Sequence, residues 1–238
     1  MKAVLINGGT GGIGSAMVRA FSDAGYCVAF TYLKNEGLAA TLVSETGALA
    51  IPADSSSEEA VSRAVRLTLT QYGRIDCLIN NAAISSYKLF SDLTLEEWNR
   101  TLAVNLTGAF LYSREVIPDM LKRKCGRIIN ISSVWGLTGA SMEVHYSAAK
   151  AGLIGMTKAL SKELGPSGIT VNAIAPGVID TPMNSHLSEE DLRVLEDETP
   201  LMRMGTPREV ADAALFLAGD SASFITGEVL NVSGGFVI

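Results

Sequence analysis

The chain has 238 residues, of which 47% are hydrophobic and 18% charged, and 19 basic against 25 acidic side chains give a net charge of −6. This composition provides enough apolar material for a large core and excludes a disordered chain. The acidic balance argues against a nucleic-acid or membrane-surface partner, which needs a basic face. The three cysteines lack CxxC spacing, and with two histidines they argue against a disulfide framework or a zinc site. No signal sequence or membrane-length apolar run is found, so we expect a cytoplasmic protein without a metal.

Short apolar runs alternate with longer helical patterns along the whole chain. The expected strands are Ala3–Ile6, Cys27–Tyr32, Ala48–Ala53, Cys77–Asn80, Arg127–Ile131, Thr170–Ala175 and Val229–Val232. The expected helices are Gly12–Ala24, Asn35–Glu45, Ser57–Tyr72, Leu95–Leu121 with interruptions near Gly108 and Pro118, Tyr146–Leu164 and Pro207–Ala218, and residues 178–203 read as irregular. This alternation requires parallel strands joined by right-handed crossovers. We predict a single α/β domain over residues 1–238, with a doubly wound, seven-stranded parallel sheet and helices on both faces.

A glycine-rich turn, Gly8-Gly9-Thr10-Gly11-Gly12-Ile13-Gly14, joins the first expected strand to the first helix. Glycines let the backbone approach a pyrophosphate, and the helix N-terminus offers free N–H groups. This context predicts a dinucleotide site of the Rossmann type, whereas a purely structural turn is the alternative. The second strand ends at Tyr32 without an acid for a ribose 2′-hydroxyl, and Lys34 follows. We therefore expect that NADP(H) is preferred and that NAD(H) is possible. The alternative is that Lys34 is only a solvated charge in a loop.

A tyrosine and a lysine, Tyr146 and Lys150, are spaced to share one face of a helix. A cation beside a phenol stabilises the phenolate, so the pair suits acid–base chemistry. Ser132 and Ser133 end the preceding strand, where the active-site groups of open α/β sheets collect. Alone, the Tyr-x-x-x-Lys spacing also fits an ordinary helix face.

Together these pieces resemble the short-chain dehydrogenase/reductase family over essentially the whole chain. The matching positions are Gly8, Gly12 and Gly14, Asp54, Asn80-Asn81-Ala82, Val104-Asn105, Ser133, Tyr146, Lys150, and Pro176-Gly177-Val178-Ile179-Asp180-Thr181. The segments 126–133 and 225–229 are most similar to those of 3-oxoacyl-carrier-protein reductases. The resemblance implies a ketone, such as a small-molecule or carrier-bound 3-oxoacyl thioester, reduced to a secondary alcohol. It also implies a homotetramer or dimer, for which the apolar segment 234–238 would suit an interface.

The resemblance also assigns roles to individual residues. It implies that Tyr146 is the general acid, that Ser133 polarises the carbonyl, and that Lys150 lowers the pKa of the tyrosine and binds the nicotinamide ribose. It further implies that Asn105 supports a water, that Asp54 binds the adenine edge, and that Ile179 binds the carboxamide. The other cofactor contacts implied are Gly8, Thr10, Gly12, Ile13, Gly14, Tyr32, Lys34, Asn81, Ala82, Pro176, Gly177 and Thr181, with residues 178–203 as the substrate loop.

Several positions depart from the family pattern. Gly11 stands where many NADP-dependent members have a basic residue, and Ser167 replaces the second of two basic residues at the carrier entrance, the first being Lys124. Glu143 precedes Tyr146 by three residues and is a candidate for the substrate pocket, because an acid suits a cationic substrate; the alternative is a solvated or ion-paired side chain. The segment 139–144 before Tyr146 also resembles that of a subgroup that reduces an aminoketone on a modified lysine of elongation factor P. This interpretation stays open, as does that of a non-catalytic dinucleotide-binding protein.

Three side chains near these motifs are expected to have structural roles. His145 is expected to be structural or to line the pocket wall. Trp98, at helical spacing from Leu95 and Leu102, is expected in the core, and His186 at the surface of the substrate loop.

Overall fold

The structure is a computed structural model that describes residues 1–184 and 187–237, so His186 and Ile238 lie outside the described residues. Its strands form one seven-stranded sheet in the order β3-β2-β1-β4-β5-β6-β7, with parallel neighbours throughout. The strands are β1 (Ala3–Ile6), β2 (Cys27–Tyr32), β3 (Leu49–Pro52), β4 (Cys77–Asn80), β5 (Gly126–Ile131), β6 (Ile169–Pro176) and β7 (Val229–Val232). The predicted doubly wound parallel sheet is therefore confirmed.

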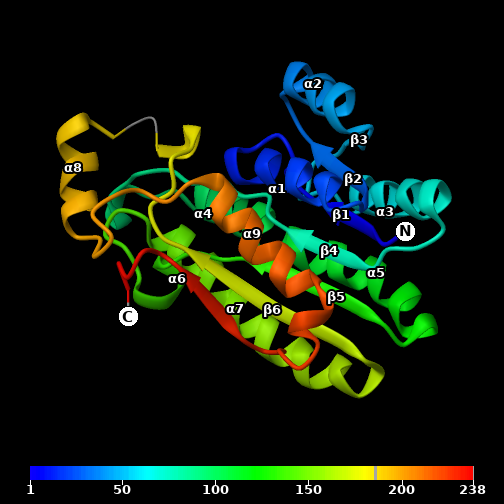
Figure 1. Cartoon of the computed structure of the whole chain (residues 1–238). Helices are drawn as coiled ribbons and strands as arrows, with labels where there is room; N and C mark the ends of the chain where they lie inside the picture. The colour runs from blue at the N-terminus through cyan, green and yellow to red at the C-terminus, as the bar shows by residue number, and fades with distance from the viewer. Residues whose placement is uncertain (185–186, 238) are drawn as a thin grey trace.

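Helices connect the strands and cover both faces of the sheet (Figure 1). They are α1 (Gly12–Asp23), α2 (Glu36–Thr46), α3 (Glu58–Tyr72), α4 (Leu95–Leu102), α5 (Gly108–Arg123), α6 (Trp135–Thr138), α7 (Val144–Leu164), α8 (Glu189–Asp197) and α9 (Pro207–Ala218). Short turns of other helix types are η1 (Phe90–Asp92), η2 (Ala103–Thr107), η3 (Gly165–Ser167), η4 (Pro182–Asn184) and η5 (Asp220–Ala222). Among the described helices, none combines the length and the apolar character that a membrane crossing requires.

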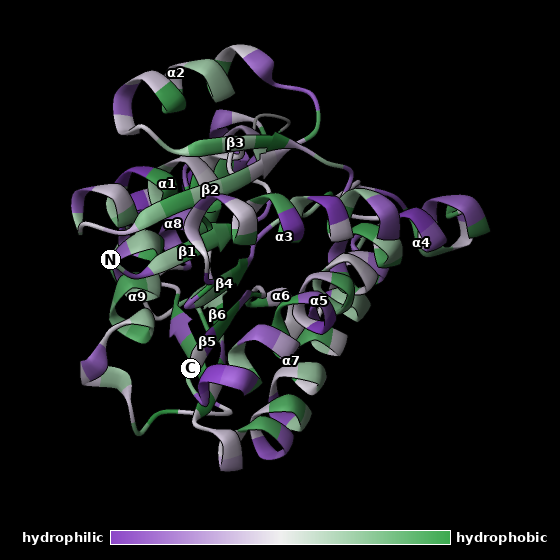
Figure 2. Cartoon of the chain, turned by 90° about the vertical axis from the view of Figure 1, so that its right-hand side faces the viewer, coloured by the Kyte–Doolittle hydropathy of each residue, from purple (hydrophilic) through white to green (hydrophobic). Residues whose placement is uncertain are grey.

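The two faces of the sheet carry separate apolar cores because successive side chains of a strand point to opposite faces. In β1, Val4 and Ile6 pack with α1, α2 and α9, whereas Leu5 packs with α3, α5 and α7. All four residues of β1 are buried, as a continuous apolar run predicts for a central parallel strand. Figure 2 shows hydrophobic strands inside and hydrophilic residues on the outer sides of the helices.

The order of the strands reverses between β1 and β4. From β1 the chain builds outward through β2 to β3, and it then returns to pair β4 with the other side of β1. The loops that leave β1 and β4 run in opposite directions at this point. A crevice therefore opens at the carboxyl ends of these two strands, and ligands of such sheets bind there. The fold thereby places the glycine turn after β1 beside the Asn80-Asn81 segment that ends β4.

The long helical stretch between β4 and β5 is interrupted at one place rather than two. Between α4 and α5 the backbone forms the π-helical turn η2, after which α5 begins at Gly108. The predicted break at Pro118 is wrong, because α5 runs through this residue. Pro118 has no N–H to donate to the carbonyl of Arg114, four residues earlier. Both residues lie on the exposed side of α5, where water can bond this carbonyl instead. Burial of the opposite side of α5 maintains the helix.

Two further expectations are corrected by the structure. Residues 178–203 are not wholly irregular, because Ser188 caps the short helix α8 in a reciprocal arrangement with Asp191. No residue of α8 is fully buried, and its nine residues are too few for their apolar spacing to predict a helix. Trp98 is only half-buried and Leu95 is 73% exposed, so this face of α4 is not part of the core.

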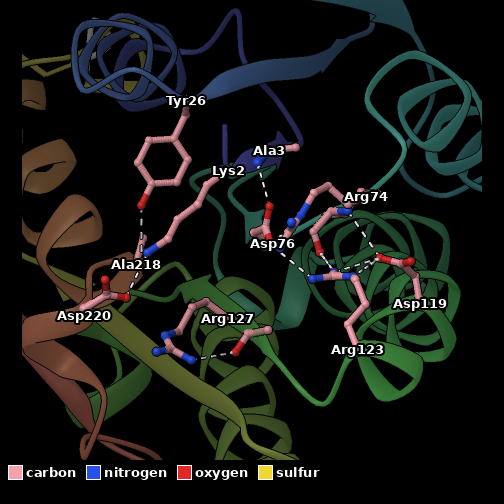
Figure 3. A network of polar contacts seen from close by, with 12 residues as sticks. Lys2, Ala3, Tyr26, Arg74, Asp76, Asp119, Arg123, Arg127, Ala218 and Asp220 are labelled. Carbon is pink, nitrogen blue, oxygen red and sulfur yellow. Dashed lines mark hydrogen bonds and ion pairs between the residues drawn. The ribbon is translucent and has the colours of Figure 1, made fainter.

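A charged network closes the sheet at the amino ends of its strands, opposite the crevice (Figure 3). The carboxylate of Asp76, which is 7% exposed, accepts hydrogen bonds from the backbone N–H of Ala3 at 2.8 Å and from Arg123 at 3.0 Å. Arg74 donates to the same carboxylate at 3.0 Å through Nε. Asp76 thereby ties β1 to the start of β4 and to the end of α5, and this end of the fold is structural.

Candidate active site

The glycine turn has the shape that a bound pyrophosphate requires. Gly8 has a φ of +70°, and a Cβ added there would lie 2.8 Å from the Cα of Ala82. A Cβ on Gly12 would lie 2.6 Å from the side-chain methyl of Thr181, and one on Gly14 would collide with the carbonyl oxygen of Gly8. No side chain caps the amino end of α1 at Gly11, so the N–H groups of its first turn are available to an anion. The residues present therefore fit a dinucleotide.

Two asparagines brace this turn against the end of β4. The side-chain oxygen of Asn7 accepts from the backbone N–H groups of Asn81 and Ala82, both at 2.6 Å. The side-chain amide of Asn81 donates to the carbonyl of Gly8 at 3.0 Å. Asn7 thus bonds the β4 loop rather than its own turn, and Asn81 is part of the frame that holds the two walls of the crevice.

Two residues from the cofactor prediction lie at the carboxyl end of β2. Tyr32 is half-buried at the end of β2, and Lys34 is exposed just after it. Within the described part of the chain, the Lys34 ammonium is paired with no carboxylate. A cation without a protein partner at this position is free to meet a phosphate group on the adenosine ribose.

Asp54, which follows β3, is held in a fixed orientation. One oxygen accepts from the backbone N–H and the hydroxyl of Ser56 at 2.9 and 2.7 Å, and the other pairs with Arg100 of α4 at 3.3 Å. These donors keep the pKa of Asp54 below its ordinary value although burial opposes them. Arg100 was not anticipated from the sequence, because only the fold brings α4 beside the end of β3.

The predicted catalytic side chains converge at the carboxyl end of β5. Tyr146 and Lys150 lie one turn apart on α7 and are 8% and 2% exposed. The Lys150 ammonium lies 5.5 Å from the centre of the Tyr146 ring and donates to the carbonyl of Ile131 at 2.7 Å. The Ser133 hydroxyl lies close enough to the Tyr146 phenol to act on its pKa. The i, i+4 spacing and the end of β5 therefore bring the three predicted groups together.

Burial determines the protonation of this pair. It raises the pKa of the Tyr146 phenol, the nearby Glu143 carboxylate raises it further, and Ser133 acts in the opposite direction. Burial also lowers the pKa of Lys150 to about 7. Removal from water disfavours both charged forms, so in this structure the phenol of Tyr146 favours its protonated form. The predicted lowering of the Tyr146 pKa by Lys150 remains a prediction.

The two adjacent serines have different surroundings. The Ser132 hydroxyl donates to the carbonyl of Lys150 at 2.9 Å and so joins β5 to α7. The Ser133 hydroxyl instead faces Tyr146 and accepts from the backbone N–H of Trp135 at 3.1 Å. This geometry favours Ser133 as the group that contacts a substrate and Ser132 as a structural hydroxyl.

Asn105 lies in the π-helical turn η2 and is 1% exposed. Its side-chain oxygen accepts from the backbone N–H of Ile84 at 2.9 Å, and its amide donates to the carbonyl of Ile84 at 2.8 Å. The side chain therefore fixes the loop that follows β4. Its predicted contact with a water remains a prediction.

Residues 84–88 and the start of α7 form one wall of the site. Ser85 donates a short hydrogen bond to the Glu143 carboxylate, and the backbone N–H of Lys88 donates to the carbonyl of Met142 at 2.8 Å. His145 is 1% exposed and contacts the Ser86 hydroxyl through Nε2 at 2.9 Å. Glu143 is half-buried and bonds a serine rather than an arginine or lysine, and its charge acts on Tyr146. The serine partners were not anticipated, because nothing in their sequence distinguishes them.

The carboxyl end of β6 completes the crevice. The carbonyl of Pro176 accepts a hydrogen bond from the backbone N–H of Val134 at 3.0 Å. Gly177 packs closely on Ser233, because a Cβ added to Gly177 would lie 2.8 Å from the Cα of Ser233. Ile179 is 4% exposed, and Thr181 lies over Gly12. Thr10 and Ile13 are partly exposed in the glycine turn. The predicted cofactor contacts at and after the end of β6 therefore line the crevice, and Thr181 packs against the glycine turn.

The comparisons with known proteins agree with this geometry. A family model described as enoyl-(acyl carrier protein) reductase matches residues 8–237. A 3-oxoacyl-(acyl-carrier-protein) reductase of Aquifex aeolicus is 43% identical over 98% of this chain and 96% of the relative. That of Thermotoga maritima is 40% identical over 100% of this chain and 98% of the relative. An acetoacetyl-CoA reductase of Shinella zoogloeoides is 42% identical, covering 98% of each chain. The chain therefore belongs to the short-chain dehydrogenase/reductase family, whose members use a nicotinamide dinucleotide, and is an oxidoreductase that acts on carbonyl and hydroxyl groups.

Proposed function

We propose that this chain reduces the 3-oxo group of an acyl thioester to a secondary alcohol with NADPH. The observation that carries the proposal is the buried cluster of Ser133, Tyr146 and Lys150 at the same edge of the sheet as the glycine turn. The printed names of the relatives, 3-oxoacyl-carrier-protein and acetoacetyl-CoA reductases, supply the substrate class.

The reaction follows from the groups that face the crevice. The hydroxyls of Ser133 and Tyr146 donate hydrogen bonds to the ketone oxygen and so stabilise the negative charge that develops on it. The dihydronicotinamide, when bound, supplies the hydride. Tyr146 then gives its phenolic proton to the alkoxide oxygen, and the product is the alcohol. Lys150 stabilises the phenolate left behind, and its ammonium is held for this purpose by the carbonyl of Ile131 at 2.7 Å.

The preference for NADPH rests on charge around the end of β2. Lys34 is exposed there without a carboxylate partner in the described residues, and Tyr32 stands where an acid would repel a 2′-phosphate. Gly11 supplies no second cation, so we expect NADH to be accepted at a lower affinity.

A purified chain with acetoacetyl-CoA tests the proposal. The loss of NADPH absorbance is expected to be rapid, and Tyr146→Phe is expected to lower kcat at least about 100-fold while NADPH still binds, because the phenol supplies the proton. The family model is described as an enoyl reductase, so crotonyl-CoA, which has a carbon–carbon double bond but no ketone, serves as the control for reduction of a double bond. Faster turnover of crotonyl-CoA, or full activity of Tyr146→Phe, would overturn the proposal. An acyl-carrier-protein thioester in a second arm decides between the carrier-bound and the CoA-bound substrate.

An aminoketone is the second candidate substrate, and Glu143 favours it. This carboxylate is half-buried beside Tyr146 and is bonded by a neutral serine, so a cationic group of a substrate would find it unneutralised. A ketone on a modified lysine of elongation factor P fits this description. Reduction of a free aminoketone in preference to acetoacetyl-CoA would favour this candidate.

We also propose that the chain works in the cytoplasm as a homotetramer or dimer. Large apolar side chains are exposed on α4 and α5, where Leu95, Phe110 and Leu121 are 73%, 46% and 41% exposed, and Phe224 next to η5 is 103% exposed. The edge strand β7 is itself only partly buried. Such surfaces are costly in contact with water and are suited to a second copy. Light scattering that gives a monomer mass at micromolar concentration would contradict this.

A further inference from the structure

The last described residues of the chain lie against the segment that carries Ser133. The ring of Phe236 packs edge-on against the ring of Trp135, with 5.5 Å between the ring centres and 80° between the planes. Figure 1 shows this end of the chain beside α6, which Trp135 begins. Edge-to-face pairs of aromatic rings have a defined geometry and stabilise beyond the apolar area that they bury. Phe236 therefore restrains the position of Trp135.

Trp135 is in turn bonded to the predicted polarising group. Its backbone N–H donates to the Ser133 hydroxyl oxygen at 3.1 Å, and that hydroxyl is within reach of the Tyr146 phenol. Because the N–H occupies one lone pair of the Ser133 oxygen, it directs the hydroxyl proton elsewhere. A hydroxyl proton that points into the crevice is the one that a ketone oxygen could accept.

The path of the segment after β7 is built to deliver Phe236. Gly234 and Gly235 have φ values of +64° and +88°, and Cβ atoms there would lie 2.8 Å from Thr199 and 2.9 Å from Pro200. The carbonyl of Gly234 accepts from the backbone N–H of Leu201 at 3.2 Å. The segment is therefore fastened to the end of the predicted substrate loop, and Phe236 joins that loop to the Ser133 segment.

We propose that Phe236 is a positioning residue for ketone reduction, which acts by holding Trp135 so that the backbone N–H of Trp135 orients the Ser133 hydroxyl. The inference rests on the proposed function, because it gives Ser133 its role toward a ketone. Phe236 itself touches neither the substrate nor the reacting atoms. Loss of its ring frees Trp135, and the hydroxyl of Ser133 then samples orientations that do not face the ketone.

A double-mutant cycle tests the proposal. Phe236→Ala is expected to lower kcat for acetoacetyl-CoA about ten-fold, because a small misplacement of a catalytic group has effects of this size or more. In a Ser133→Ala chain the same change is expected to have almost no effect, because the group that it positions is absent. The dissociation constant of NADPH should stay the same in all four chains. Phe236→Tyr, which keeps the ring, should retain wild-type turnover, and Leu67→Ala, at a leucine of α3 that is 43% exposed and belongs to neither the site nor the proposed interface, is the control.

A second readout reports the aromatic contact directly. The chain has two tryptophans, so in a Trp98→Phe background the emission comes from Trp135 alone. Phe236→Ala should shift this emission, whereas Leu67→Ala should not. Phe236→Leu, which keeps an apolar side chain, replaces Phe236→Ala if the latter fails to fold.

The possible outcomes separate this inference from the proposed function. Equal losses from Phe236→Ala in the wild-type and Ser133→Ala chains would show a merely structural role and overturn the inference. An unchanged kcat in Phe236→Ala would overturn it as well, while Ser133→Ala remained impaired and the proposed function stood. If Ser133→Ala keeps full activity, or if no ketone is reduced, Ser133 has no role that Phe236 could support, and both proposals fall.

Discussion

Replacement of each of the two adjacent serines by alanine is expected to damage different properties of the protein. Ser133→Ala removes a hydroxyl that faces the Tyr146 phenol, and Ser132→Ala removes one that bonds the carbonyl of Lys150 at 2.9 Å. The two side chains are 7% and 3% exposed, so both changes occur in a dry environment and remove the same atom. Their consequences differ only through the partner of each hydroxyl.

The partners set the expected magnitudes. One preorganised donor to a developing oxyanion is worth about 3 kcal/mol, so Ser133→Ala should lower kcat about 100-fold. A buried hydrogen bond between a hydroxyl and a carbonyl contributes about 1 kcal/mol to folding, so Ser132→Ala should lower the melting temperature by about 3 °C. Lys150 should keep its position in Ser132→Ala, because its ammonium is held separately by the carbonyl of Ile131 at 2.7 Å. Its kcat should therefore stay within about three-fold of wild type.

Two measurements check this contrast. Turnover of acetoacetyl-CoA is followed by NADPH absorbance at saturating concentrations of both compounds, and unfolding is followed by circular dichroism during heating. The NADPH affinity of both variants serves as the control for an intact crevice. A Ser132→Ala chain that loses more turnover than Ser133→Ala would refute the assignment of the two hydroxyls, as would a Ser133→Ala chain that keeps more than about a third of wild-type turnover.

Three other predictions concern charged residues of the site. Lys34→Ala should raise the KM for NADPH about ten-fold and leave that for NADH unchanged, and an equal change for both would show that Lys34 does not contact the 2′-phosphate. Glu143→Gln should lower the ratio of kcat/KM for an aminoketone to that for a neutral ketone of equal length about ten-fold, whereas an unchanged ratio means that Glu143 is no substrate ligand. Because burial lowers the pKa of Lys150 from 10.5 to about 7, the unfolded chain binds one more proton between these pH values. The free energy of unfolding should therefore rise by about 2 kcal/mol between about pH 7 and pH 9, a rise that Lys150→Met should remove and that urea titrations at both pH values measure.

The sequence by itself determined the features of this protein that depend on neighbours along the chain. The apolar run of β1 and the helical pattern after it are local, and so is the glycine turn between them. The i, i+4 spacing places Tyr146 and Lys150 on one helix face wherever that helix lies. Because a strand of a parallel sheet must be followed by a crossover, the alternation of these local patterns was also sufficient to predict the doubly wound sheet.

Tertiary structure decided what depends on residues far apart in the chain. The family resemblance already pointed to Ser133, but the hydrogen-bond partner of Ser132 depends on the packing of α7 on the end of β5, which brings the carbonyl of Lys150 to this hydroxyl. The pairing of Arg100 with Asp54 required α4 to lie beside the end of β3. The helix α8, which has nine residues and none that is fully buried, and the course of α5 through Pro118 were likewise not predictable from periodicity.

The contact between Phe236 and Trp135 shows the same limit most plainly. Neither residue belongs to a motif, and their rings meet only because β7 and β5 lie on either side of β6 in one sheet. The order of the strands is a global property, since it is set by how the two apolar cores close on both faces. Local patterns predict which groups a chain can offer to its active site, whereas the packing of distant elements decides which of them meet and in what orientation.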